Sequence, residues 1–205
     1  MNETSGAAER RGSEKIMTLN TTGENTLNNR LKAKDYALIG QFAALIALCS
    51  WITIPSVVPF TMQTFAVFLT VGLLGGRRGS LTVVIYLLLG AIGLPVFSGF
   101  SGGIGYMMGP TGGYMIGFIA SALLMWAMER FLGGSQPVLI SSMVLGLLAC
   151  YAFGTAWFVI VYTKNTGAIG LGTALGWCVF PYIIPDALKI ALSAFLCRRL
   201  KRFVY

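Results

Sequence analysis

The sequence predicts an all-α integral membrane protein with six transmembrane helices and both termini in the cytoplasm. Of its 205 residues, 56% are hydrophobic and only 11% are charged. The apolar residues fall in long blocks rather than in short alternating strands, as in helices that span a bilayer. Most lysine and arginine residues lie next to the ends of these blocks that would be on the same side of the membrane. By the positive-inside rule, that side is the cytoplasm.

The first 34 residues are polar and rich in Asn, Thr, Glu and Arg. They lack the apolar stretch of a secretory signal, so we expect a disordered cytoplasmic tail over residues 1–34. Residues 35–205 are expected to form one transmembrane domain.

Four blocks in that domain approach or exceed the roughly 20 residues that cross the hydrocarbon of a bilayer. They cover residues 36–54, 111–131, 138–162 and 178–197. Residues 61–96 are long enough for two shorter spans, which the sequence Gly75-Gly76-Arg77-Arg78-Gly79 is expected to separate. Together these blocks give a count of six helices.

The net charge of +8 follows from this topology. Basic residues lie before the first span, in the turn at 75–79, after the fourth span and at the C-terminal end, whereas Lys164 falls in a loop on the opposite side. The positive-inside rule then accounts for the basic excess, which disfavours nucleic-acid binding. The four cysteines lie within or beside apolar blocks and the chain has no histidine, so neither a disulfide framework nor a metal site is expected.

Two irregular segments are expected on the external side. Residues 90–114 contain nine glycines and two prolines, which disfavours a straight helix, and such backbone is tolerated at membrane depth only where protein buries it or it lines a cavity. An ordinary solvent loop is the alternative. Residues 54–63 are apolar and carry two prolines, which suits either a cover over a site or a plain tight connection. Neither segment matches a phosphate-binding motif, so the chain is not expected to hydrolyse ATP itself.

Asp186 and Lys189 are the charged residues of the apolar run 180–196. Charges at membrane depth are costly and usually mark a functional site. The two residues are three apart, so they share one helix face, and Pro185 suits the first helical turn. Arg198 lies twelve residues further on, about 18 Å along a helix, which puts the pair in the external half of the membrane.

Such a pair suits the polar head of a small ligand whose apolar remainder contacts aromatic and methionine side chains. An ion pair satisfied only within the helix is one alternative. A proton relay is another, disfavoured because no second acid or histidine continues a path.

The chain resembles the BioY family, the biotin-specific substrate-binding (S) components of energy-coupling factor (ECF) transporters, over roughly residues 36–202. The motifs that carry the resemblance are Pro59-Phe60-Thr61-Met62-Gln63-Thr64, Gly90-Ala91-Ile92-Gly93-Leu94-Pro95, Gly102-Gly103, Gly109-Pro110-Thr111-Gly112-Gly113-Tyr114 and Pro185-Asp186-Ala187-Leu188-Lys189. The resemblance implies the six-helix S-component fold in a multi-pass bacterial cell-membrane protein. It also implies transport of biotin without enzymatic activity or a cofactor, and a transmembrane T component and two cytoplasmic ATPases as partners.

By the same resemblance, Asp186 accepts hydrogen bonds from the ureido N–H groups of biotin, and Lys189 positions Asp186 or donates to a biotin oxygen. Residues of the glycine-rich loop cover the bicyclic ring and the valeryl chain. The residues expected to contact the ligand are Phe60, Gln63, Ser101, Gly102, Gly103, Tyr106, Tyr114, Asp186 and Lys189.

Two positions depart from the family pattern. Ser101 and Met115 stand where some relatives carry an amide and an arginine. Because Met115 does not pair with the valerate carboxylate, backbone N–H groups of the glycine-rich loop or Lys189 are the candidates for that contact.

Ala43 and Ala47, with Gly40 and Ala44 beside them, match the family's coupling motif of small residues four apart, which implies an interface with the T component. A helix contact within the chain is equally permitted. Two other functions stay open from the residues alone. One is a different small vitamin on the same scaffold, and the other is an intramembrane enzyme with Asp186 as general base, for which no activated nucleophile, metal set or cofactor motif is present.

Overall fold

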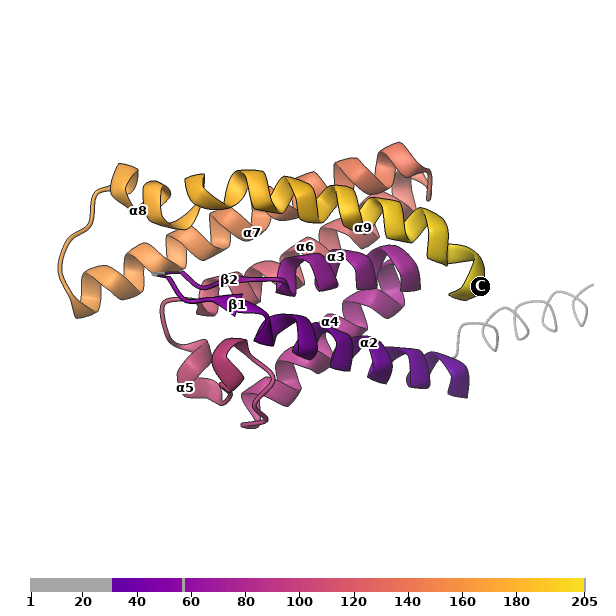
Figure 1. The fold of residues 1–205 in the computed structure, drawn as a ribbon, viewed down its shortest axis with the longest axis horizontal. Helices are drawn as coiled ribbons and strands as arrows, with labels where there is room; N and C mark the ends of the chain where they lie inside the picture. The colour runs from indigo at the N-terminus through magenta and orange to yellow at the C-terminus, as the bar shows by residue number, and fades with distance from the viewer. Residues whose placement is uncertain (1–30, 57, 205) are drawn as a thin grey trace, which may run out of the picture. The chain divides into compact units, whose positions relative to one another are not determined.

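The computed structural model describes residues 31–56 and 58–204 (Figure 1). Of the expected N-terminal tail, residues 1–30 lie outside the described chain, and residues 33 and 34 already belong to a helix. In the first turn of that helix the Asp35 carboxylate accepts a hydrogen bond from the Lys32 backbone N–H at 2.8 Å. The compact unit that holds the remaining elements begins at Ala37.

The described chain is mostly helical, as predicted. A helix coincides with the core of each of the six expected blocks: α2 (Ala33–Trp51), α3 (Gln63–Leu74), α4 (Gly76–Ala91), α6 (Gly112–Leu132), α7 (Gln136–Asn165) and α9 (Ile183–Val204). Three helical segments of the described residues are long and apolar enough to cross a membrane, namely Gly112–Leu132, Gln136–Asn165 and Leu171–Arg202. The count of six membrane spans therefore stays a prediction.

The predicted break between the second and third blocks is confirmed at Gly75. This residue has φ +78°, a conformation that side chains with a Cβ rarely adopt, and it ends α3 and begins α4. The Glu129 carboxylate accepts a 2.5 Å hydrogen bond from the Gly76 N–H and so caps the start of α4.

The core lies around α3, which is buried along almost its whole length and packs against α4, α6 and α9. The most extensive helix contact joins α6 to α7. There a Cβ on Gly117 would lie 2.9 Å from the Cys150 Cα, and the Ser121 hydroxyl donates to the Gly146 carbonyl. Small residues at such a crossing let two helix backbones approach closely, which is how helices associate in lipid.

The glycine-rich segment 90–114 is not a straight helix, as predicted, and it leaves α4 at Ala91, earlier than the expected end at residue 96. It contains a 3-10 turn, Ser98–Phe100, and the short helix α5 (Ile104–Met107). Phe97 is fully buried and packs edge-on against Tyr86, whereas several apolar side chains of the segment are exposed: Ile92, Leu94, Phe100, Ile104 and Met108. The segment is thus neither fully buried nor an ordinary solvent loop.

Two elements were not expected. Residues 53–61 form a small antiparallel hairpin of β1 (Thr53–Ile54) and β2 (Phe60–Thr61). Helix α8 (Leu171–Cys178) precedes a 3-10 turn, Phe180–Tyr182, so α9 begins at Ile183 and not at residue 178. Pro185 lies in the first turn of α9, as predicted. Figure 1 shows α9 running beside α7.

Candidate functional site

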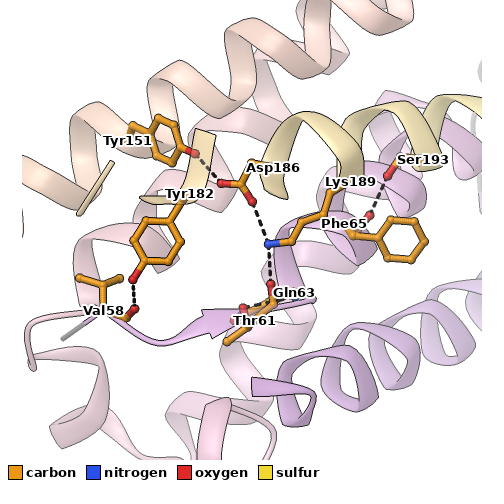
Figure 2. Close-up of polar contacts among 9 residues, drawn as sticks. All are labelled: Val58, Thr61, Gln63, Phe65, Tyr151, Tyr182, Asp186, Lys189 and Ser193. Carbon is orange, nitrogen blue, oxygen red and sulfur yellow. Dashed lines mark hydrogen bonds and ion pairs between the residues drawn. The ribbon is translucent and has the colours of Figure 1, made fainter. Parts of the chain in front are cut away.

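Asp186 and Lys189 lie on one face of α9 and form a buried ion pair (Figure 2). The Lys189 Nζ is 2.8 Å from the Asp186 Oδ1, and the two residues are only 5% and 4% exposed. The prediction that these charges meet on a helix face is confirmed.

Each member of the pair has a second partner from another element. The Tyr151 hydroxyl, from α7, donates a 2.5 Å hydrogen bond to the Asp186 Oδ2. The Lys189 Nζ donates to the Thr61 carbonyl of β2 at 2.7 Å and lies 4.0 Å from the centroid of the Phe60 ring. The ammonium is therefore in contact with three protein groups.

The Asp186 carboxylate has hydrogen-bonding positions without a partner in the described part of the chain. A carboxylate offers about four lone-pair positions, and Asp186 accepts one bond at each oxygen from Lys189 and Tyr151. Two acceptor positions therefore have no partner among the described residues. This capacity leaves Asp186 able to accept further hydrogen bonds.

The pair lines a cavity bounded by the hairpin, the glycine-rich segment and helices α3, α6, α7 and α9. The empty space between these walls, including solvent at the open mouth, is about 640 Å³. Besides Asp186 and Lys189, its walls are Val58, Pro59, Phe60, Thr61, Gln63, Thr64, Ser98, Tyr106, Thr111, Tyr114, Met115, Phe118, Leu147, Cys150, Tyr151, Cys178 and Tyr182.

Six of the nine expected ligand contacts lie in these walls: Phe60, Gln63, Tyr106, Tyr114, Asp186 and Lys189. Two of them are held by hydrogen bonds outside the ion pair. The Gln63 amide donates to the Tyr86 hydroxyl at 2.9 Å, and the Tyr114 hydroxyl donates to the Cys178 carbonyl at 3.2 Å. Their positions are thus fixed before any ligand enters.

The other three, Ser101, Gly102 and Gly103, do not line the cavity. They make contacts within the glycine-rich segment and, through Gly103, to the end of α4. The Ser101 carbonyl accepts from the Phe97 N–H at 2.9 Å, and the Gly103 N–H donates to the Gly90 carbonyl at 2.7 Å. A Cβ on Gly102 would collide with the Leu94 carbonyl. From this segment, the expected contacts Tyr106 and Tyr114 line the cavity, as do Ser98 and Thr111.

Tyr151 and Tyr182 were missed by sequence reasoning. The Tyr182 hydroxyl donates to the Val58 carbonyl, and its ring stacks on Phe60 with centroids 6.1 Å apart, so it holds the hairpin against the start of α9. A tyrosine within an apolar block is itself a signal, because a buried hydroxyl requires a hydrogen-bond partner.

A model of the BioY family matches residues 22–205. The chain belongs to the BioY family. It is 36% identical over 172 residues to the probable biotin transporter BioY of Pyrococcus horikoshii, covering 83% of this chain and 98% of that protein. It is 39% identical over 164 residues to the biotin transporter BioY of Thermotoga maritima, covering 80% of this chain and 93% of that protein.

The fold also matches a crystal structure of the S-component for biotin from an ECF-type ABC transporter. The TM-score is 0.75 at 25% sequence identity, over 84% of this chain and 95% of that one. The family resemblance inferred from the motifs is thereby confirmed. BioY is a family of transport proteins and not of enzymes, so the hypothesis of an intramembrane enzyme is not taken further.

The small residues of α2 in this BioY-family chain lie on two sides of the helix. Ala43 and Ala47 are 3% and 7% exposed and belong to the chain's own core. The small residues that α2 exposes are Ala33, Ala37, Gly40 and Ala44, and a Cβ on Gly40 would meet no atom within 4 Å. The contact within the chain, stated as the alternative, accounts for Ala43 and Ala47.

Proposed function

We propose that this chain is a membrane-embedded subunit that captures biotin at the external face for uptake. The observation that carries the proposal is the buried carboxylate of Asp186, which lines an open cavity and retains acceptor capacity. The match to an S-component for biotin supports this choice of ligand.

The ureido ring of biotin has two N–H donors that point away from opposite sides of the ring, and either one complements a carboxylate with free lone pairs. Asp186 accepts from one side of the ring, while Tyr151 and Lys189 hold the carboxylate in place. Hydrogen bonds to a charged acceptor are the strong ones, at about 1.5–3 kcal/mol each. The walls of Phe60, Phe118 and Leu147 suit the apolar bicycle and chain of the ligand.

The membrane arrangement is part of the same proposal. Six spans place both termini in the cytoplasm of a bacterial cell, so that the hairpin and the glycine-rich segment face outward. A fluorescent protein fused to the C-terminus is expected to mature and fluoresce in cells. A fluorescent signal only from fusions to the loop around Lys164 would reverse the orientation.

The partners are a transmembrane T component and two cytoplasmic ATPases. The exposed Gly40 and Ala44 of α2 replace Ala43 and Ala47 as the proposed contact, because small residues permit close helix approach in lipid.

Binding of tritiated biotin by the purified chain tests the proposed ligand. Asp186→Asn keeps the shape of the side chain and removes its charge, so we expect saturable binding to be lost. Asp35→Asn is the matched control, since Asp35 is also buried but lies outside the cavity. Displacement of the label by thiamine or riboflavin and not by unlabelled biotin would instead favour a different vitamin.

A further inference from the structure

The cavity is electrically balanced before a ligand enters. Among its described walls, the side chains charged in their usual protonation states are Asp186 and Lys189, which pair at 2.8 Å. Elsewhere the polar wall groups are neutral, and they include the hydroxyls of Ser98 and Tyr106, 3.1 Å apart, and of Thr111. Met115 is 4% exposed and contributes a thioether.

Lys189 is poorly placed to neutralise a carboxylate on the ligand. Its ammonium already contacts the Asp186 carboxylate, the Thr61 carbonyl and the Phe60 ring. A second carboxylate at Lys189 would place two anions around one cation in a site that is 4–5% exposed. Burial of an uncompensated charge is strongly unfavourable, so a ligand carboxylate is more stable at the open mouth, in water.

A neutral group at the same end of the ligand meets no such penalty. Hydroxyl and backbone groups hydrogen-bond an amide or an ester as readily as an acid, and the cavity remains neutral. We propose that the site recognises the ureido ring of biotin and not its carboxyl group. The chain then also takes up biotin derivatives whose carboxyl group is amidated or esterified. The substrate class is then amides and esters of the biotin carboxyl group, including biotin joined through an amide bond to the amino group of a lysine. This inference rests on the proposed function.

Competition against tritiated biotin on the purified full chain tests the inference, with biotinamide and biotin methyl ester as the competing probes. Both neutral probes are expected to have dissociation constants within about threefold of that of biotin. A biotinamide affinity weaker by about 30-fold or more would overturn the inference and leave biotin capture intact. Absence of biotin binding would overturn both, so the two failures are distinguishable.

Variants that add a cation to the wall test the physical cause. In Met115→Arg, and in Thr111→Lys at a less buried position, free biotin is expected to gain about tenfold over biotinamide. Met115→Leu is the matched neutral control and is expected to keep the two affinities about equal. If both charged variants still bind biotinamide and show no preference for the free acid, the explanation from charge balance is wrong.

Discussion

Separate removal of the two buried charges should destabilise the protein far more than their joint removal. Asp186→Asn leaves the Lys189 ammonium, 5% exposed, with a carbonyl and an amide as partners, and Lys189→Met leaves a carboxylate held only by Tyr151. An uncompensated buried charge of this kind costs about 3–5 kcal/mol. In a chain of this length that corresponds to a fall in Tm of roughly 6–20 °C. The double variant removes both charges and is expected to recover most of the loss.

Thermal unfolding of the four proteins in one detergent, in the absence of ligand, measures the cycle. The expected coupling between the two positions is at least about 3 kcal/mol. Biotin binding should be lost in all three variants, including the stable double variant, because each changes the acceptor or its support. If the loss of stability in the double variant equals the sum of the losses in the two single variants, the two charges do not stabilise each other and the reasoning is refuted. Retained binding in the double variant would refute the role of the Asp186 carboxylate.

Three further outcomes are expected. Tyr151→Phe removes one hydrogen bond to the Asp186 carboxylate and should weaken biotin binding roughly 10- to 150-fold in a titration, with wild-type affinity as the contrary result. Gly102→Ala forces a Cβ against the Leu94 carbonyl, so unfolding measurements should detect a loss of about 1–3 kcal/mol, and an unchanged Tm would contradict the loop packing. Ala44→Leu should leave biotin binding intact and reduce copurification with the T component, whereas undiminished copurification would move the partner face elsewhere.

The sequence predicts best those features that depend on residues close together in the chain. Long apolar blocks locate α6 and α7, and Gly75 locates the end of α3, because length and backbone conformation are local properties. The meeting of Asp186 and Lys189 is likewise predictable, because a separation of three residues places two side chains on one helix face.

Features that depend on which face of a helix points inward are not predictable in the same way. Hydropathy distinguishes apolar from polar faces, but a helix in lipid is apolar on both its lipid side and its core side. This is why Ala43 and Ala47 were assigned to a partner face although they are buried, while Ala44 is exposed. Tyr151 was missed because it is 35 residues from Asp186 in an unbroken apolar block, and only the packing of α7 beside α9 joins them.

The same ion pair can stabilise the empty protein and still select a ligand, because its two members differ in how many partners they have. Lys189 already contacts three protein groups, whereas Asp186 retains room for two more donors. A ligand that presents N–H donors to the carboxylate occupies that room without breaking an existing bond. A ligand without such donors buries the carboxylate against apolar atoms and leaves its lone pairs unmatched, which costs about 1–3 kcal/mol for each lost bond. Selectivity among small vitamins therefore depends more on the two acceptor positions of the Asp186 carboxylate that lack a donor than on the shape of the apolar walls.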